Sequence, residues 1–454
     1  MRVRLKSGLA LAFVVSALSC VSASARDYIV ELKSEKTHGI EFSDREEIAP
    51  DTYVFDDFET LGLKLMGFCD SAEEDVPLQL HSEELQFYDV DYMQDMEISA
   101  LKKISSKGEG VKVAVIDTGC NVDHEDLVGA NIKEGYNYII NSTDVTDTKG
   151  HGTNVMGLLT AVEDNGIGID GIATNAEYYP LCVYYNGNSS VSALIKAIYA
   201  AVDTYECDII NMSLGVNVDV TTLKKAIEYA SSKGVILVAS AGNDGATTYN
   251  YPASYPQVIS VSSVNASYQR ESFSQYNDEV DVTAPGVCPS LTIQGYKTYR
   301  GTSESAPIIT GVLTVVAGEY KKDHPGENMD AFAVIKAATK DLNTSGRDDE
   351  TGYGYLIATE ALNFIKDPSN IFISPFYINS DNVNVKIYSP RNGTVTLIRS
   401  GFDDNVFDSA TSEEITFEDN LYTNSEASGA NEKTRLFAVS NMNTLKPVSN
   451  VREY

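Results

Sequence analysis

The sequence is poor in basic residues. Of its 454 residues, 34 are Lys or Arg and 65 are Asp or Glu, which gives a formal net charge of −31. Nucleic-acid binding needs clustered Lys and Arg, so this composition argues against a nucleic-acid partner. The excess of acidic groups favours solubility instead, and some of the carboxylates could hold Ca²⁺.

Paired cysteine motifs are also missing. The five cysteines that follow residue 25 are scattered, and no two of them form a C-x-x-C pair. This spacing excludes a standard zinc module. An odd number indicates at least one free thiol or an intermolecular bond, and the sequence does not give the connectivity. These cysteines are Cys69, Cys120, Cys182, Cys207 and Cys288.

No run of apolar residues is long enough to span a membrane. The run from Leu9 to Leu18 follows a basic N-terminal segment and precedes the small residues Ala23-Ser24-Ala25. This order predicts a signal peptide over residues 1–25 that is removed on export. An uncleaved anchor is the alternative, and the cleavage-like site argues against it.

The stretch GTSESAP, residues 301–307, combines a serine with the start of a predicted helix. Ser303 precedes the apolar run SAPIITGVLTVVAGEY, which has helical spacing. Unpaired backbone N–H groups and the positive end of the helix dipole gather there and would stabilise developing negative charge. A nucleophilic serine needs a base, and the base needs a carboxylate. On this stretch alone, an N-cap role for Ser303 is the alternative.

The centre of the chain alternates strand-like and helix-like patterns. The run VKVAVID (111–117) is almost continuously β-branched, as expected of a strand buried on both faces of a parallel sheet. Similar runs recur at 176–185, 208–215, 235–243 and 258–264, with helical patterns at 190–205 and 220–234 between them. The alternation predicts an α/β domain, and polar groups that end its strands should share one rim.

Three polar residues could complete a catalytic site around Ser303. Asp117 ends a buried strand and could orient a histidine, although capping a turn is the usual role of Asp before Thr-Gly. His151, one of five histidines, opens an apolar helical run, where a cation is disfavoured. This suggests a neutral base, with a surface loop histidine as the alternative. Asn243 follows a strand and could donate to an oxyanion or simply form a turn.

Together, the motifs DTG, HGT, SLG, AGN and GTSxSAP occur in this order along an α/β domain. The set resembles the subtilisin-like serine proteases (subtilases), in which the catalytic residues follow the order Asp, His, Ser. The resemblance runs from about Val111 to Ile365. It implies a subtilisin-like three-layer fold with a mostly parallel sheet, and a serine endopeptidase that forms an acyl-enzyme intermediate.

By this resemblance Ser303 is the nucleophile, His151 the general base and Asp117 the carboxylate that orients the imidazole. Asn243 is the oxyanion-hole side chain, which acts with the backbone N–H of Ser303. Extended peptide would bind by strand addition between two edge segments. The expected edges are Ser213, Leu214 and Gly215 on one side and Gly187 to Ser190, including Ser189, on the other, and the expected pocket wall is Ser240, Ala241 and Gly242.

Two positions near the catalytic residues depart from the family pattern. Glu304 follows the nucleophile, where subtilases often carry Met or a small residue, and Asn154 stands where many carry a second histidine. Glu304 could stabilise the imidazolium or point to solvent, and the second alternative is slightly favoured. Asp244 and Asn250 lie where the pocket rim and floor are expected, which leaves medium-sized and basic side chains open as substrates.

The resemblance also implies a structural Ca²⁺ site. The expected ligands are Asp126, Asn165 and the carbonyl oxygens near Ile167 and Ile169. Hard oxygen ligands of this kind suit Ca²⁺. Glu279 and Asp281 resemble part of a weaker cation site. Solvated surface acids are the alternative in a chain this acidic.

Two regions flank the expected catalytic domain, residues 96–366. Residues 26–95 begin with the strand DYIVELK and end with LHSEELQFYDVDYMQD, a short helical run followed by another strand. They loosely resemble the small α+β propeptide that inhibits subtilases, and we expect autocatalytic cleavage near residues 85–100. Residues 367–454 show short alternating strands, which predict a small β-sandwich-like module with a packing or spacer role.

These observations predict a secreted, calcium-assisted serine endopeptidase. Its partners would be protein or peptide substrates and its own propeptide, and it would act as an extracellular or cell-surface monomer. One alternative is a pseudoprotease that binds through its acidic face and C-terminal module, although the intact catalytic set argues against it. Another is a dedicated processing protease that cuts the leader of one partner.

Overall fold

A computed structural model describes most of the chain. The described residues are 4–5, 27–33, 40–41, 47–56, 63–64, 68–69, 71–85, 91–368, 371–374, 377–378, 382–390, 394–403, 406–417, 421–427, 433–439 and 452–453. The predicted signal peptide, residues 1–25, lies outside them except for Arg4 and Leu5. Within these ranges, no helix is both long enough and apolar enough to cross a bilayer.

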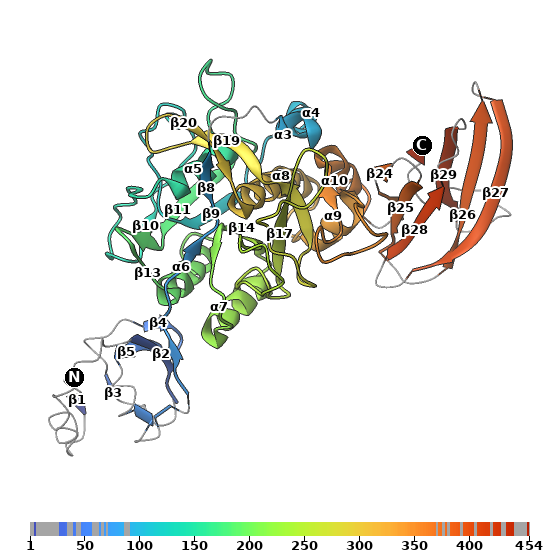
Figure 1. The fold of residues 1–454 in the computed structure, drawn as a ribbon. Coiled ribbons are helices and arrows are strands. Elements are labelled where there is room, and N and C mark those ends of the chain that lie inside the picture. The colour runs from blue at the N-terminus through green and yellow to red at the C-terminus, as the bar shows by residue number, and fades with distance from the viewer. Residues whose placement is uncertain are drawn as a thin grey trace.

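A large sheet forms the centre of the molecule (Figure 1). Its strand order is β10 (Tyr136–Asn137), β11 (Glu177–Cys182), β9 (Lys112–Asp117), β14 (Ile209–Met212), β16 (Ile236–Ser240), β17 (Val258–Val264), β18 (Val282–Pro285), β22 (Tyr355–Leu356) and β21 (Thr339–Lys340). All neighbouring strands are parallel except β21 and β22, which are antiparallel. The predicted mostly parallel sheet is therefore confirmed.

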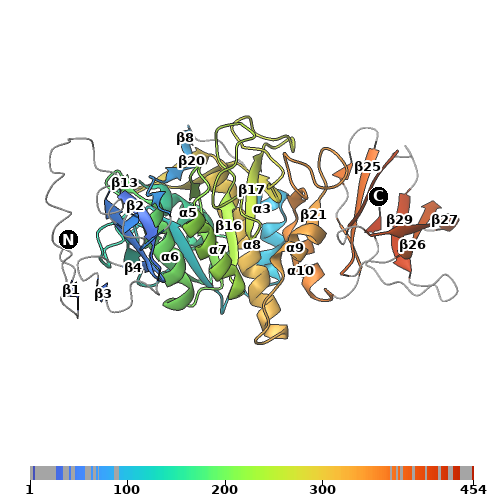
Figure 2. The ribbon, with the colours of Figure 1, turned by 90° about the horizontal axis from the view of Figure 1, so that it is seen from below.

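Helices cover both faces of this sheet (Figure 2). One layer contains α5 (His151–Thr160), α8 (Thr302–Asp323), α9 (Ala331–Ala338) and α10 (Ala358–Ile365), and the other contains α6 (Val191–Asp203) and α7 (Thr221–Ser232). In β9, Val113 and Val115 face the first layer, whereas Ala114 and Ile116 face the second. Burial on both sides explains the continuous apolar run, and the three-layer α/β fold is confirmed.

The N-terminal region forms a small antiparallel sheet beside α6. Its strand order is β4 (Glu47–Ala49), β5 (Thr52–Asp56), β2 (Asp27–Glu31) and β6 (Glu73–Glu74). A shorter pair, β1 (Arg4–Leu5) and β3 (Ile40–Glu41), stands apart from it. Figures 1 and 2 place this sheet and the C-terminal module at opposite ends of the central domain.

Two carboxylates attach this sheet to the central domain. Glu73 accepts hydrogen bonds from the backbone N–H groups of Thr221 (2.7 Å) and Thr222 (3.1 Å) at the start of α7. Asp75 accepts one from the backbone N–H of Ser192 at 2.9 Å, at the start of α6. Negative charge is favourable at helix N-termini, so both contacts stabilise the docked arrangement.

The end of the N-terminal region differs from the prediction. The expected helical run contains strand β8 (Glu83–Leu85), and the expected last strand contains helix α3 (Tyr92–Asp95), which α4 (Ile98–Lys103) follows. β8 pairs with β20 (Tyr296–Arg300), so pairing with a distant segment overrides the local helical pattern. The Asp91 side chain caps α3 by accepting from the Gln94 N–H. Residues 86–90 lie outside the described residues.

The C-terminal module consists of antiparallel strands in two sheets. One sheet holds β23 (Phe372–Ile373), β24 (Tyr377–Ile378), β25 (Asn382–Tyr388) and β28 (Leu421–Ala427), and the other holds β26 (Thr394–Asp403), β27 (Val406–Thr416), β29 (Lys433–Val439) and β30 (Arg452–Glu453). Lys386, on β25, is buried and donates to the carbonyl of Tyr353 at 2.6 Å and to the hydroxyl of Thr339. This lysine links the module to the central domain.

The five cysteines that follow the predicted signal peptide are all buried, and the described part of the chain contains no disulfide between them. The odd number of cysteines predicted at least one free thiol or an intermolecular bond, and this stays a prediction. Their burial makes them part of the packed interior and not a cross-linking framework.

Candidate active site

Asp117 and His151 meet at the carboxyl edge of the sheet. Asp117 is the last residue of β9, and its Oδ1 accepts a hydrogen bond from His151 Nδ1 at 2.7 Å. The same carboxylate accepts one from the backbone N–H of Thr118, also at 2.7 Å. Both side chains are buried. A carboxylate in this position fixes the imidazole tautomer and leaves Nε2 for chemistry.

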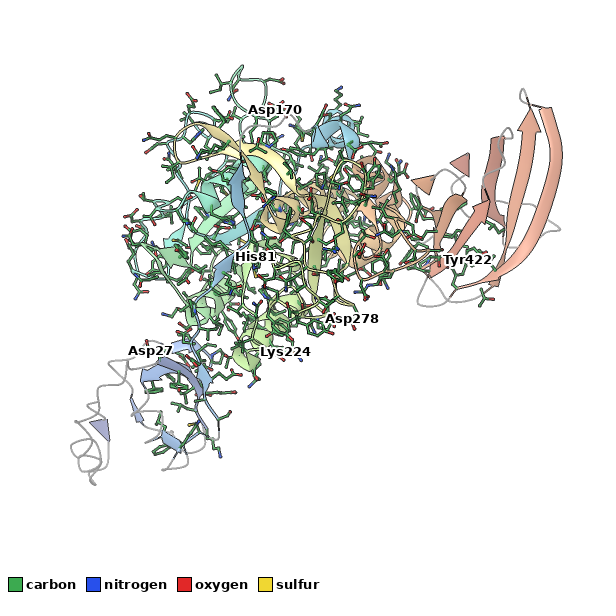
Figure 3. All side chains as sticks on the ribbon, viewed as in Figure 1. Asp27, His81, Asp170, Lys224, Asp278 and Tyr422 are labelled. Carbon is green, nitrogen blue, oxygen red and sulfur yellow. The ribbon has the colours of Figure 1, made fainter. Side chains whose placement is uncertain are left out.

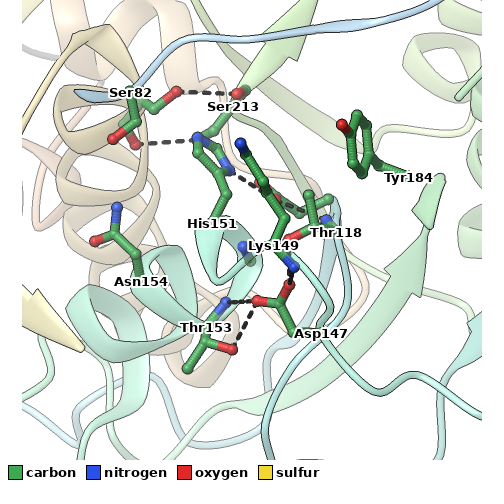
Figure 4. A network of polar contacts seen from close by, with 12 residues as sticks. Ser82, Thr118, Asp147, Lys149, His151, Thr153, Asn154, Tyr184 and Ser213 are labelled. Atoms are coloured by element: carbon green, nitrogen blue, oxygen red, sulfur yellow. Dashed lines mark hydrogen bonds and ion pairs between the residues drawn. The ribbon is translucent and has the colours of Figure 1, made fainter. Parts of the chain in front are cut away.

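Asp147 holds the start of the helix that carries His151. Its Oδ1 accepts from the N–H of Gly150 at 2.7 Å and from the hydroxyl of Thr118 at 2.8 Å. Its Oδ2 accepts from the N–H of Thr153 at 2.9 Å (Figure 4). Gly150 has a φ of 91°, in the left-handed region that favours glycine. Asp147 therefore caps α5, which begins at His151.

Ser303 lies in the first turn of α8 and is fully buried. Its hydroxyl donates to the carbonyl oxygen of Ser213 at 3.0 Å. Among the described residues, no hydrogen-bond partner reaches Nε2 of His151. A hydrogen bond between the Ser303 hydroxyl and Nε2 of His151 is thus not formed in this conformation.

Asn243 and the backbone N–H of Ser303 lie around one peptide carbonyl. The Ser303 N–H donates to the carbonyl oxygen of His81 at 3.1 Å. A Cβ added to Gly301 would stand 2.0 Å from this oxygen and 2.8 Å from Asn243 Nδ2, so both atoms flank the same glycine. Asn243 Oδ1 accepts from the N–H of Thr302 at 3.0 Å, and its Nδ2 lies on the side of Gly301 that also faces this carbonyl. The role of Asn243 as an oxyanion-hole donor stays a prediction.

The carbonyl that lies at Ser303 belongs to an extended segment of the same chain. β7 (Gln79–Leu80) pairs antiparallel with β15 (Leu214–Gly215), the first predicted substrate edge. His81 follows directly, and its carbonyl oxygen reaches the Ser303 N–H. Strand addition to an exposed edge is a general mode of peptide binding. The N-terminal region therefore occupies the predicted peptide-binding edge.

The second predicted edge contacts this segment from the other side. Ser189, in β13 (Asn188–Ser189), accepts through Oγ from the N–H of Leu78 at 2.9 Å. Gly187, with a φ of 84°, makes the turn between β13 and its partner β12 (Tyr184–Tyr185). The structure thus brings both predicted edges to one extended segment.

The side chain of His81 is buried in the predicted pocket, within the central domain (Figure 3). Its Nδ1 lies 2.7 Å from Ser240 Oγ, and its Nε2 lies 3.3 Å from Asn250 Nδ2. Ala241 is buried, and a Cβ on Gly242 would stand 3.3 Å from Asn250 Nδ2, so these residues also border the pocket. The pocket therefore presents a hydroxyl and an amide to the ring.

Glu304 is fully buried, so the expectation that it points to solvent is wrong. Its Oε1 accepts from the Ser82 hydroxyl at 2.6 Å and from Asn154 Nδ2 at 2.7 Å. Within the described ranges, its Oε2 has no hydrogen-bond partner. The two departures from the family pattern, Glu304 and Asn154, thus form one polar cluster with the residue that follows His81.

The environment shifts the pKa values of the buried acid and base. Burial raises the pKa of Glu304 to about 7, against opposing effects of the Ser82 hydrogen bond, the charge of His151 and the Asn154 hydrogen bond. Burial by itself lowers the pKa of His151, but the Asp117 carboxylate and then Glu304 raise it by more. Glu304 can therefore change charge near neutral pH.

The predicted Ca²⁺ ligands lie in two segments, with Asp126 before α5 and Asn165, Ile167 and Ile169 after it. Asp126 is fully buried, and its two carboxylate oxygens accept from Asn165 Nδ2 at 2.7 Å and from the N–H of Ile169 at 3.0 Å. Asn165 Oδ1 accepts from the N–H of Ile167 at 3.0 Å. In the part of the chain that the structure describes, no three His, Cys, Asp or Glu side chains form a group that could hold a metal ion.

Asp281, expected in a weaker cation site, makes other contacts. It accepts from the N–H of Ser260 at 3.0 Å and lies 3.6 Å from the guanidinium of Arg347. Burial raises its pKa to about 7. An arginine thus provides the positive charge nearest to this carboxylate.

Sequence analysis missed three contributors to the site. Asp147 could have been found from its position four residues before His151, because an acceptor ahead of a helix often caps it. His81 and Ser82 were assigned only to the propeptide. The pairing of β7 with β15 brings them to the site, and pairing across such a distance leaves no local signal.

Comparison with known proteins gives one family. The model of the Subtilase family matches residues 108–354, more than half of the 454-residue chain. The minor extracellular protease Epr of Bacillus subtilis (strain 168) is 36% identical over 269 residues, which cover 58% of this chain and 40% of that protein. The subtilisin of Bacillus pumilus is 36% identical over 236 residues, 50% of this chain and 84% of that protein.

Further matches agree in fold and sequence. The thermophilic serine proteinase of Bacillus sp. (strain AK1) is 39% identical over 223 residues, 48% of this chain and 55% of that protein. The chain thus matches 40% of the length of the Epr protease and 55% of the length of the thermophilic serine proteinase. A crystal structure of a lanthipeptide protease superposes with a TM-score of 0.55 at 24% identity, covering 60% of this chain and 93% of that one. At this identity the structure supports the fold alone.

The raised pKa of Glu304 predicts a pH-dependent stability. A carboxyl whose pKa is about 7 when folded and 4.5 in its ordinary state stabilises the protein below pH 4.5, and this contribution is lost as the pH rises through 7. In a protein that carries Ser303→Ala, the further change Glu304→Gln should remove this loss. The free energy of unfolding of the double variant, minus that of the Ser303→Ala protein, should therefore rise by roughly 3 kcal/mol between pH 4 and pH 8.

Urea unfolding at both pH values measures this difference. Glu228→Gln, an exposed position on α7, is the matched control and should show no such change. Parallel pH profiles for the parent and the Glu304→Gln variant would contradict the assignment.

Proposed function

The chain belongs to the subtilase family, and from this premise we propose that it is a serine endopeptidase that hydrolyses peptide bonds through an acyl-enzyme on Ser303. One observation carries the proposal. A peptide carbonyl, that of His81, lies at the backbone N–H of Ser303, in the site where Asp117 holds the ring of His151.

In the proposed reaction, the Ser303 hydroxyl leaves the Ser213 carbonyl and donates to Nε2 of His151. His151 takes the proton while Oγ attacks the carbonyl carbon, and it then gives the proton to the leaving amine. Water, activated by the same imidazole, hydrolyses the ester. Asp117 stabilises the imidazolium without itself becoming protonated.

We propose that the N-terminal region is an inhibitory propeptide. Support comes from the strand pairing of Gln79–Leu80 with the substrate edge and from the carboxylates of Glu73 and Asp75 at two helix starts. A segment that fills the peptide-binding edge excludes other substrates until it is cut and released.

We propose that the protein is exported and acts as a monomer outside the cell. The basic, apolar and small-residue order of residues 1–25 supports export. The relative from Bacillus subtilis (strain 168) is itself named an extracellular protease. Intact mass of the secreted Ser303→Ala protein tests the loss of residues 1–25, and its native mass tests the monomeric state. A retained N-terminus would contradict export processing.

We propose that the loop around Asp126 holds a structural Ca²⁺. The residues fit the ion in their chemistry, because the Asp126 carboxylate, the Asn165 amide oxygen and the carbonyls of Ile167 and Ile169 are all hard oxygen donors. Bound Ca²⁺ would supply positive charge that ties the loop together, and the peptide chemistry does not involve it.

Calcium should stabilise the Ser303→Ala protein. At a free concentration of 100 times its Kd, the ion would add about 2.7 kcal/mol to the free energy of unfolding. Thermal unfolding with calcium and with a chelator measures this shift, and Asp126→Asn should reduce it. A midpoint that does not respond to calcium in the parent protein would contradict the proposed site.

Asn243→Ala should lower turnover by roughly 100–1,000-fold, because it removes one donor to the oxyanion. The effect should fall on kcat more than on KM, since the charge develops only in the transition state. Steady-state cleavage of a peptide by the processed enzyme measures both constants. A loss confined to KM would assign Asn243 to substrate binding instead.

Labelling with a fluorophosphonate probe tests the proposal as a whole. The wild-type protein should label at Ser303, and Ser303→Ala should not label and should keep its N-terminal region, as intact mass would show. A folded, processed wild-type protein that does not label would favour the binding-protein alternative.

A further inference from the structure

We infer that the protein cleaves its own chain at the His81–Ser82 bond and that two pockets read this pair, one for an imidazole before the bond and one for a hydroxyl after it. The inference rests on the proposed protease activity and names its substrate class, peptides in which histidine precedes serine or threonine. Cleavage after His81 lies upstream of residues 85–100, where the sequence led us to expect it. The propeptide would then end at His81 and not at residue 95.

Strand pairing on both sides of the nucleophile fixes which bond faces it. Before the bond, β7 pairs with β15. After it, β8 pairs with β20, the strand that leads into the Ser303 turn. Only His81 and Ser82 stand between the two paired segments, and the carbonyl of His81 is the one that accepts from the Ser303 N–H. The bond that follows His81 therefore lies at the nucleophile.

The cleavage balances with water as the only co-reactant. Ser303 Oγ bonds to the carbonyl carbon of His81, and the bond from that carbon to the nitrogen of Ser82 breaks. The hydroxyl proton passes through His151 to this nitrogen, which becomes the new N-terminus. Water then hydrolyses the ester, which restores Ser303 and leaves a carboxylate on His81.

A series of side-chain contacts fixes what the first pocket presents to the His81 ring. The Asp244 carboxylate accepts from Asn217 Nδ2 at 3.4 Å, so Asn217 Oδ1 accepts from Asn250 Nδ2 at 3.0 Å. The second hydrogen of Asn250 Nδ2 then points to His81 Nε2, at 3.3 Å. Nε2 is thus an acceptor, and Nδ1 carries the hydrogen that goes to Ser240 Oγ.

The pocket consequently matches a neutral imidazole better than the two substrate types left open by the sequence. A protonated ring would place an N–H at Nε2, directly against the N–H that Asn250 donates. Burial also lowers the pKa of His81 to about 3, and the charge of His151 lowers it further. An apolar side chain would leave the Ser240 hydroxyl and one N–H of Asn250 without the partner that the ring provides in a buried site. A basic side chain would meet a hydroxyl and an amide here, because the described hydrogen-bond partners of the His81 ring do not include a carboxylate.

The second pocket is the cluster of Glu304 and Asn154. A buried carboxylate needs hydrogen-bond donors, and Glu304 has two, Asn154 Nδ2 and the hydroxyl of Ser82. The first belongs to the enzyme, and the second belongs to the residue after the cleaved bond. A residue without a donor at that position would leave Glu304 with one donor only, so the pocket selects serine or threonine.

The test uses the full chain and then the processed enzyme. The secreted wild-type protein should begin at Ser82, whereas Ser303→Ala should stay joined across the bond. The processed enzyme is then given peptides that copy residues 76–85, either unchanged or with one substitution at the position of His81 or Ser82. The measured quantity is kcat/KM for each peptide.

For the hydroxyl pocket, the Ser82→Ala peptide should be cut roughly tenfold to a hundredfold more slowly than the parent peptide, and the Ser82→Thr peptide at a similar rate to the parent. In the Glu304→Met enzyme, the ratio of kcat/KM for the parent peptide to kcat/KM for the Ser82→Ala peptide should fall to about one. Glu304→Gln keeps an acceptor oxygen and should give an intermediate ratio, which also provides a readout if Glu304→Met does not fold. Glu228→Met is the control and should keep the wild-type ratio.

For the imidazole pocket, His81→Phe and His81→Lys peptides should be cut more slowly than the parent peptide, and Ser240→Ala should reduce this preference. A mature chain that begins elsewhere than Ser82, or equal rates for the Ser and Ala peptides, would overturn the inference. Labelling with the fluorophosphonate probe separates this failure from failure of the proposed function. If the enzyme labels and cuts peptides but shows none of these preferences, the inference is contradicted and the proposed protease function is kept.

Discussion

The antiparallel pairing of Gln79–Leu80 with Leu214–Gly215 is the interaction on which the rest of the site depends. It is a backbone contact, so it sets the register of the bound segment without regard to side chains. Because side chains alternate along a strand, a shift of one residue would turn His81 out of its pocket and place a different carbonyl at Ser303. The contacts of Ser82 with Glu304 and of His81 with Ser240 follow from this one register.

Ser303, the proposed nucleophile, adjoins a buried polar network. Glu304 adjoins Ser303 in sequence, and its carboxylate is removed from water. Burial of an unpaired carboxylate is strongly unfavourable, so such a group either gains donors or takes up a proton. Glu304 shows both responses. Its Oε1 accepts from two donors, whereas no described residue donates to its Oε2, and its pKa is raised to about 7. The network is therefore sensitive to whatever lies at the position of Ser82.

Much of the architecture could be predicted from the sequence, because burial on both faces of β9 leaves a continuous apolar run and helices leave periodic ones. The same patterns placed Asp117 and Ser303 at the ends of elements that share one rim. The structure departs from the prediction at Glu83–Leu85 and Tyr92–Asp95, and Glu304 was expected in solvent. The strand at Glu83–Leu85 and the burial of Glu304 depend on long-range contacts, of β8 with β20 and of Glu304 with Ser82 and Asn154, which leave no local signal. Helix α3 differs, because its Asp91 cap is a local feature that the prediction missed.

The hydrogen bond between Ser82 and Glu304 also couples substrate choice to protonation. The donor from Ser82 lowers the pKa of Glu304, so by linkage the ionised carboxylate holds a hydroxyl more tightly than the neutral acid does. The negative charge of Glu304 in turn raises the pKa of His151. A hydroxyl at the position of Ser82 therefore favours the ionised form of Glu304, and in the proposed reaction this form would stabilise the imidazolium. In the proposed cleavage, selection of the residue after the bond and stabilisation of the charged base thus depend on the same carboxylate.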